Sequence, residues 1–173
     1  MTGEATEIVL FLGGARSGKS RMAQARAERA PGELVYVATG EALDAEMTDR
    51  IAKHRSDRGA RWRTVEAPLA LAEAIRRESM RGRAVLVDCL TLWLSNLILS
   101  ERDVVAETSA LLAALADARG TVLIVSNEVG LGIVPDNALA RRFRDEAGRL
   151  NQAVAAAASE VLFVAAGLPL RMK

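Results

Sequence analysis

Eight residues close to the start of the chain constrain it more than any other segment. They read Gly13-Gly14-Ala15-Arg16-Ser17-Gly18-Lys19-Ser20 and fit the pattern G-x-x-x-x-G-K-[ST] without a mismatch. An apolar run of strand length, residues 8–12, precedes them, and residues 17–30 read as a helix closed by Pro31-Gly32. In this setting glycines let backbone N–H groups converge on phosphate oxygens, and the start of the helix adds its positive end. The sequence therefore predicts a phosphate loop that binds a nucleoside triphosphate.

Three side chains in or near this loop are expected to act on the triphosphate. Lys19 supplies a cation for the β- and γ-phosphates, and the Ser20 hydroxyl is a candidate ligand for Mg²⁺. Asp88 ends another apolar run of strand length, which is the position of the metal-binding acid in many phosphate-loop enzymes. The alternative for Asp88 is a cap for a helix over residues 90–99, because aspartate is favoured just before a helix.

The rest of the chain alternates apolar runs of strand length with helical stretches. Strands are expected at residues 8–12, 34–38, 62–65, 84–87, 122–125 and 161–165, the last being the final strand. Helices are expected at residues 17–30, 44–54, 68–80, 90–99, 104–119 and 137–158, with Pro68 in the first turn of its helix. The strands are continuous Val, Ile and Leu runs, which indicates burial on both faces. The pattern predicts an α/β fold with a mainly parallel sheet between helix layers.

Composition limits the remaining possibilities. The chain has 173 residues, so residues 1–173 are expected to form one domain, and half of them are hydrophobic. A formal net charge of +1 gives no overall attraction for nucleic acid. The single cysteine, Cys89, excludes an internal disulfide framework and is interpreted as a packed small residue. No signal peptide and no apolar run long enough to span a membrane are apparent, and we expect a cytoplasmic protein.

The only histidine, His54, lies in a segment with a local excess of positive charge. Residues 53–63 contain five Lys and Arg. Two interpretations stay open. The segment is a solvated helix end, where cations are favoured, or His54 is a nucleophile beside a polyphosphate. In the second case a neutral imidazole attacks phosphorus near neutral pH, and Arg55 and Arg58 contact the phosphates or the base.

Several segments, in order along nearly the whole chain, resemble one family. They are residues 13–20, 36–39, 50–55, 62–66, 87–91, 126–135, 141–145 and 149–152. The most specific are Asn127-Glu128-Val129-Gly130 and the Arg-Ile-x-x-His pattern that ends at His54. Through these segments the chain resembles the bifunctional adenosylcobinamide kinase/adenosylcobinamide-phosphate guanylyltransferases of cobalamin biosynthesis.

The resemblance implies two reactions at one triphosphate site. ATP or GTP gives its γ-phosphate to a hydroxyl of adenosylcobinamide, and the preferred donor stays open. GTP then gives GMP to His54, and the GMP–histidine intermediate passes GMP to adenosylcobinamide phosphate, yielding adenosylcobinamide-GDP. The resemblance also implies a three-layer P-loop NTPase fold of the RecA-like type, and a homotrimer with sites between subunits.

The resemblance and the motifs together define the candidate site. His54 and Lys19 are the catalytic candidates, and Ser20 and Asp88 are the candidates for Mg²⁺. Glu128 either binds substrate or accepts a proton, or it braces its loop. The nucleotide-binding candidates, with Glu66 expected near the guanosine, are Gly13, Gly14, Ala15, Arg16, Ser17, Gly18, Lys19, Ser20, Thr39, Gly40, Glu41, Arg55, Arg58, Glu66 and Asp88.

Two other classes of function stay open on the residues alone. A single-activity phosphate-loop kinase for another small metabolite would use His54 only as a phosphate contact. A non-catalytic nucleotide-binding regulatory protein would need switch or partner-binding segments, and no additional domain or long loop of that kind is apparent.

Overall fold

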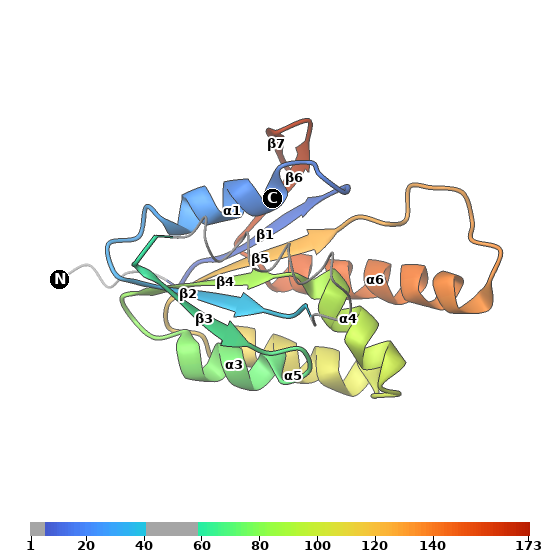
Figure 1. The fold of residues 1–173 in the computed structure, drawn as a ribbon, viewed down its shortest axis with the longest axis horizontal. Helices are drawn as coiled ribbons and strands as arrows, with labels where there is room; N and C mark the ends of the chain where they lie inside the picture. Colours follow the sequence, from blue (N-terminus) through green and yellow to red (C-terminus); the bar gives the residue numbers. More distant parts are fainter. Residues whose placement is uncertain (1–5, 41–58) are drawn as a thin grey trace.

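The computed structural model describes residues 6–40 and 59–173, and a seven-stranded sheet forms its centre (Figure 1). The spatial order of the strands is β3-β2-β4-β5-β1-β6-β7. All neighbours pair in parallel except β6 and β7, which are antiparallel. The mainly parallel α/β fold predicted from the sequence is therefore confirmed. The strands are β1 (Ile8–Gly13), β2 (Glu33–Ala38), β3 (Trp62–Glu66), β4 (Arg83–Asp88), β5 (Thr121–Asn127), β6 (Glu160–Ala165) and β7 (Leu168–Arg171).

Helices cover both faces of this sheet and complete the predicted three layers. Figure 1 shows α1 on one face and the other labelled helices on the opposite face. Successive side chains of β1 alternate between the two cores, as strand geometry requires: Val9 and Phe11 pack with α1, whereas Leu10 and Leu12 pack toward the other helices. The helices are α1 (Lys19–Ala27), α3 (Leu71–Glu78), α4 (Leu90–Leu99), α5 (Val104–Ala116) and α6 (Ala138–Ala157).

The structure corrects three details of the predicted helices and strands, and a fourth predicted element lies outside the residues that it describes. Pro68 is not in the first turn of a helix, because α3 begins at Leu71. Helices α1 and α5 end earlier than expected, at Ala27 and Ala116. Residues 161–165 are not the final strand, because β7 follows; all residues of β7 are exposed, so it lacks the apolar run that marked the other strands. The helix expected over residues 44–54 lies outside the described residues.

The strand register brings the carboxyl ends of five adjacent strands to one edge of the sheet. Gly13 at the end of β1 is the partner of Asn127 at the end of β5. Ala38 at the end of β2 is the partner of both Glu66 in β3 and Asp88 in β4. Ligands of open parallel sheets bind at this edge, so the register gathers the predicted site residues that end these strands. Within the described part of the chain, no helix has both the length and the apolar character needed to cross a membrane.

Candidate nucleotide-binding site

The phosphate loop has the strand–loop–helix arrangement that its sequence predicts. Strand β1 ends at Gly13 and α1 begins at Lys19. Two residues of the loop, Arg16 and Gly18, have left-handed backbone angles, with φ of 56° and 96°. Gly18 is the residue before α1, and no side chain caps the first turn of that helix. The loop therefore presents free backbone N–H groups and the positive end of α1 to the same space, as anion binding requires.

Lys19 is buried inside this loop. The residue is only 7% exposed, and its Nζ donates a hydrogen bond of 2.9 Å to the carbonyl of Gly14. Desolvation lowers the pKa of Lys19 below its ordinary value, and electrostatic interaction with Cys89 and Asp88 opposes that shift. A bound anion would stabilise the charged form of this ammonium group, which burial disfavours and the nearby carboxylate only partly restores. A second polar group of the loop, the buried Ser17 hydroxyl, has no hydrogen-bond partner in the described residues.

Asp88 ends β4 on the row of strand ends described above. The residue that precedes α4 is Cys89, and no side-chain hydrogen bond caps that helix. The alternative in which Asp88 caps the helix is therefore wrong. The carboxylate of Asp88 acts electrostatically on Lys19, and its metal-binding role stays a prediction.

Cys89 is a packed residue, in agreement with the sequence interpretation. Its side chain is buried, and desolvation raises the pKa of its thiol to about 11. At neutral pH the group is a thiol, whereas the nucleophilic form of cysteine is the thiolate.

Thr39 joins the ends of β2 and β4 rather than facing open space. It is fully buried, and its Oγ1 donates to the carbonyl of Cys89 at 2.7 Å and accepts from the Cys89 N–H at 2.8 Å. The amide of Asn96 donates to the carbonyls of both Thr39 and Pro68. The expected contact of Thr39 with the nucleotide stays a prediction, and in this structure its hydroxyl is used within the protein. Sequence reasoning missed Asn96, because nothing in its local sequence indicates these partners.

The remaining predicted residues fall into two groups. Gly40 follows β2, and a Cβ added there would lie 3.2 Å from Leu92, so this position suits glycine. Glu66 is the exposed last residue of β3, beside Ala38 on the row of strand ends. The other candidates lie outside the described residues: Glu41, His54, Arg55 and Arg58.

Glu128 braces its loop against the phosphate loop. Its backbone N–H donates to the carbonyl of Gly13 at 3.0 Å, and its carboxylate accepts from the N–H of Gly130 at 2.5 Å. Just before it, the N–H of Asn127 donates to Thr91 Oγ1 at 2.8 Å. Asn151 of α6 accepts from the Ser126 hydroxyl and donates to the carbonyl of Asn127. Of the two roles considered for Glu128, these contacts support bracing. Thr91 and Asn151 are site-supporting residues that sequence reasoning did not identify.

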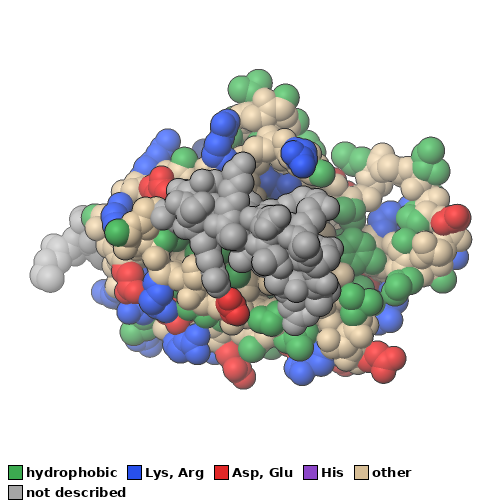
Figure 2. All heavy atoms as spheres, in the orientation of Figure 1, with side chains coloured by type: hydrophobic (Ala, Val, Ile, Leu, Met, Phe, Trp, Pro, Cys, Tyr) green, Lys and Arg blue, Asp and Glu red, His purple; other side chains and the backbone are tan. Residues whose placement is uncertain are grey.

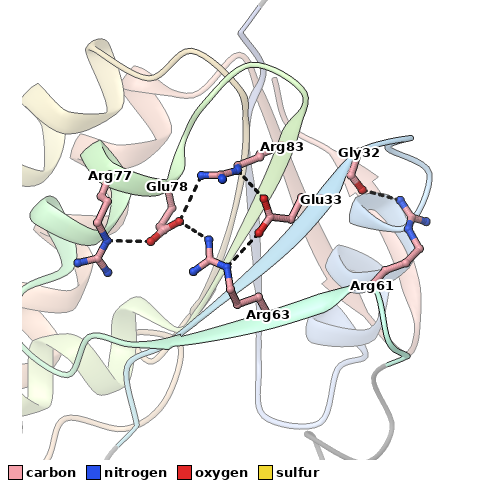
Figure 3. Close-up of polar contacts among 7 residues, drawn as sticks. All are labelled: Gly32, Glu33, Arg61, Arg63, Arg77, Glu78 and Arg83. Carbon is pink, nitrogen blue, oxygen red and sulfur yellow. Dashed lines mark hydrogen bonds and ion pairs between the residues drawn. The ribbon is translucent and has the colours of Figure 1, made fainter.

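Two cations of the basic segment are bound far from the phosphate loop. Arg63 pairs with Glu33 and Glu78, and Arg61 donates to the backbone carbonyl of Gly32 (Figure 3). The partners Glu33 and Gly32 lie where β2 begins, at the edge opposite the strand ends that gather the site. Arg61 and Arg63 therefore serve the structure, and the predicted phosphate contacts in this segment rest on Arg55 and Arg58.

Comparison with known proteins gives consistent results over almost the whole chain. The model of a protein family described as cobinamide kinase / cobinamide phosphate guanyltransferase matches residues 9–172. The chain is 51% identical over 166 residues to the bifunctional adenosylcobalamin biosynthesis protein CobP of Pseudomonas aeruginosa, covering 95% of this chain and 96% of the relative. It is 41% identical over 181 residues to proteins named bifunctional adenosylcobalamin biosynthesis protein CobU from Salmonella typhimurium and Escherichia coli. These alignments cover 96% of this chain and 99% of each relative.

Proposed function

The chain belongs to the cobinamide kinase/cobinamide phosphate guanyltransferase family, and on this basis we propose that its one phosphate loop serves both activities. Membership confirms the predicted enzyme of cobalamin biosynthesis, which is a kinase and a guanylyltransferase. In the first proposed step ATP or GTP phosphorylates adenosylcobinamide. In the second, GMP from GTP passes through His54 to adenosylcobinamide phosphate, giving adenosylcobinamide-GDP. Residues 1–173 are proposed to be the single domain that carries out both steps.

The observation that carries this proposal is the buried ammonium of Lys19 at the carboxyl edge of the sheet. Its hydrogen bond to Gly14 holds it inside the loop, and the electrostatic effect of Asp88 reaches it there. A triphosphate bound by the loop would place its β- and γ-phosphates at this cation. The eight residues of the loop would then contact the nucleotide mainly through the backbone.

Ser20 and Asp88 are the proposed protein ligands of Mg²⁺. Ser20 lies in the first turn of α1 and Asp88 ends β4, and both offer the oxygen atoms that Mg²⁺ prefers. The described residues contain no group of three or more His, Cys, Asp or Glu side chains that could hold a metal ion. A site of few protein ligands, completed by phosphate oxygens, is the usual arrangement for Mg²⁺. When bound, the ion would neutralise part of the charge on the triphosphate.

The two reactions differ in which phosphorus atom is attacked. In the kinase step the substrate hydroxyl oxygen bonds to the γ-phosphorus, the β–γ bridging bond breaks, and a nucleoside diphosphate leaves. In the transferase step a ring nitrogen of His54 bonds to the α-phosphorus of GTP and pyrophosphate leaves. A phosphate oxygen of adenosylcobinamide phosphate then bonds to that phosphorus and the nitrogen–phosphorus bond breaks. Covalent transfer divides one displacement into two easier ones.

Labelling with GTP tests the proposal directly. Incubation with α-labelled GTP is expected to leave acid-labile, base-stable label on the protein, whereas γ-labelled GTP leaves none on His54. The variant His54→Ala is expected to lose the label and guanylyl transfer while keeping phosphorylation of adenosylcobinamide. Absence of α-label on a protein that demonstrably binds GTP would refute the histidine intermediate.

A homotrimer is the proposed assembly. Apart from Leu99 and Val105, the large apolar side chains that are more than half exposed in the described residues gather on two projections of the molecule, the loop that leads into α6 with the first turn of that helix, and β7 with the residue after it (Figure 2). These side chains are Leu131, Ile133, Val134, Leu139, Leu168, Leu170 and Met172. Exposed apolar groups of this kind are typical of surfaces that are covered in an assembly. Sedimentation or light scattering of the active enzyme should give three times the chain mass of 18.5 kDa, and an active monomer would contradict the proposal.

A further inference from the structure

The turn between β6 and β7 lies directly against the phosphate loop. Ala165 and Leu168 are partners in the β6–β7 pair, so Ala166 and Gly167 alone form the turn. Both have left-handed backbone angles, with φ of 51° and 77°. Two consecutive left-handed residues are typical of the tight hairpin turn that matches strand twist. The turn is therefore a defined element rather than an irregular tail.

A hydrogen bond and two close contacts join this hairpin to the loop. The N–H of Gly167 donates to the carbonyl of Ser17 at 2.8 Å. A Cβ added at Gly18 would lie 3.3 Å from the Cα of Gly167. One added at Gly13 would lie 2.3 Å from the carbonyl oxygen of Val164 in β6. The hairpin therefore leaves no room for a side chain at Gly13 and little room for one at Gly18.

This hydrogen bond fixes the orientation of the Ser17–Gly18 peptide unit. In a trans peptide the carbonyl and the N–H point in opposite directions. Since the carbonyl of Ser17 points at Gly167, the N–H of Gly18 points away from the hairpin. That N–H has no backbone acceptor among residues 6–40 and 59–173. It is a donor at the start of α1 that is left for a ligand.

The end of β7 is anchored as well, so the turn does not move freely. The N–H of Met172 donates to the carbonyl of Val161 at 2.8 Å. The Nζ of Lys173 donates to the carbonyls of Ala155 and Ala156, at the carboxyl end of α6. A cation at that end of a helix is favourably placed. The hairpin is held at both ends, by the sheet and by α6.

We propose that the β6–β7 turn positions the phosphate loop, and that Gly167 is the positioning residue. By holding the Ser17 carbonyl, Gly167 keeps the Gly18 N–H free and oriented for a phosphate oxygen of the nucleoside triphosphate. This role rests on the proposed nucleotide site. Gly167 does not contact the nucleotide itself, and it acts through the peptide unit of Ser17 and Gly18.

A second glycine, Gly82, provides a matched control, because it has the same left-handed backbone angle at a different place in the fold. Gly82 also has φ of 77°, and, like Gly167, it has no atom within 4 Å of an added Cβ. Gly82 precedes β4, at the edge of the sheet where the parallel strands begin, which we call the amino edge. The substitutions Gly167→Val and Gly82→Val therefore introduce comparable local strain, but only the first disturbs the loop. The affinity of each variant for GTP with Mg²⁺ is measured by calorimetry, together with KM and kcat of both reactions.

We expect Gly167→Val to raise the Kd for GTP at least about tenfold, since a hydrogen bond to a charged group contributes affinity of this order. Gly82→Val is expected to lower thermal stability while keeping the Kd within about twofold. Gly167→Asn is expected to bind severalfold more tightly than Gly167→Val, because both keep the backbone N–H but only asparagine tolerates the left-handed angles that aim it at Ser17. Should Gly167→Val fail to fold, Gly167→Ala introduces less bulk and replaces it in the comparison.

The measured Kd values distinguish failure of the proposed role of the β6–β7 turn from failure of the proposed nucleotide site. Equal Kd values for the Gly167 and Gly82 variants, whether both unchanged or both raised, would overturn the role of the turn. The variant Lys19→Ala is measured in parallel. If it leaves the Kd for GTP unchanged, the phosphate loop itself is not the nucleotide site. If it raises the Kd while the Gly167 variants do not, only the role of the turn fails.

Discussion

The two edges of the sheet handle charge in opposite ways. At the amino edge the buried carboxylate of Glu78 accepts from Arg63 at 2.5 Å and from Arg77 at 2.8 Å, and it lies 3.6 Å from Arg83 (Figure 3). Glu33 pairs with two of the same arginines. At the carboxyl edge the buried ammonium of Lys19 has a single hydrogen bond within the described residues, to a backbone carbonyl.

This difference separates stability from function. Charges at the amino edge are neutralised inside the protein, so they join β2, β3, β4 and α3 without needing a ligand. The cation at the carboxyl edge is desolvated and only partly compensated, so the proposed triphosphate would supply the missing negative charge. Substitutions at the two edges should therefore change different measurable quantities.

The largest expected effect comes from Lys19→Ala. Loss of the cation that we propose to face the phosphates should reduce kcat/KM of both reactions by at least about 100-fold. The free energy of unfolding should not fall, because a desolvated ammonium group is removed along with its solvation cost. Steady-state kinetics and urea denaturation measure the two quantities. Arg21→Ala, an exposed change in the same helix, is the control; unchanged rates in Lys19→Ala would show that the two reactions do not share this site.

Next in size is the substitution Glu78→Gln at the opposite edge. The Glu78 side chain is 4% exposed, so its loss leaves several arginines without their shared carboxylate. The free energy of unfolding should fall by about 2 kcal/mol, which is less than the roughly 3–5 kcal/mol for breaking a fully buried ion pair because the arginines are partly solvated. The kinetic constants of the folded enzyme should stay the same. A smaller loss is expected for Glu33→Gln, since that side chain is 39% exposed, and a larger one would reverse the assignment of Glu78 as the centre of the network.

The pH dependence of stability provides a finer test of the amino edge. The hydrogen bond from Arg63 is the largest cause that lowers the pKa of Glu78 below its ordinary value of 4.5, although desolvation opposes it. A lowered pKa means that the stabilisation is complete above about pH 4.5 and is lost as the pH falls through the pKa of the folded protein. The difference in unfolding free energy between the native protein and Glu78→Gln should therefore shrink in acid. A difference that stays constant down to pH 3 would show that the charge of Glu78 is not responsible.

The smallest effect concerns Cys89, which follows β4 at the carboxyl edge of the sheet. Because burial raises its pKa to about 11, the folded protein should react slowly with a thiol reagent at pH 8. Addition of denaturant should expose the thiol and bring the rate to that of a free cysteine. Rapid modification of the folded enzyme at pH 8 would indicate that this part of the carboxyl edge opens in solution.

The parts of the molecule that the sequence predicted well are those determined by local pattern. The phosphate loop is a contiguous motif, and the buried strands are contiguous apolar runs, so both could be identified without knowing their neighbours. Strand β7 could not, because its residues are exposed on a sheet edge and its partner is chosen by the turn at Ala166 and Gly167.

The contacts that support the candidate site could not be predicted from the sequence, for a related reason. The hydroxyl of Thr39 bonds to Cys89, 50 residues away, and Asn151 bonds to Ser126, 25 residues away. Such contacts depend on the register of neighbouring strands and on helix packing, which no short sequence pattern encodes. The partners of Arg63, in the basic segment of residues 53–63, could not be predicted for the same reason. Arg63 lies in that run, but the pairing of β3 with β2 brings it to the acidic groups of the amino edge.

The position of β1 has a consequence for synthesis of the protein. The strand that leads into the phosphate loop leaves the ribosome before its partners β5 and β6, and its first residue, Ile8, pairs with Val122. Until residues 121–165 have been made, both edges of this apolar strand lack their native neighbours. We therefore expect the nascent chain to expose an aggregation-prone segment until β5 and β6 have been made, and the nucleotide site to form only after them. A chain stalled before β5 should bind a chaperone in place of GTP.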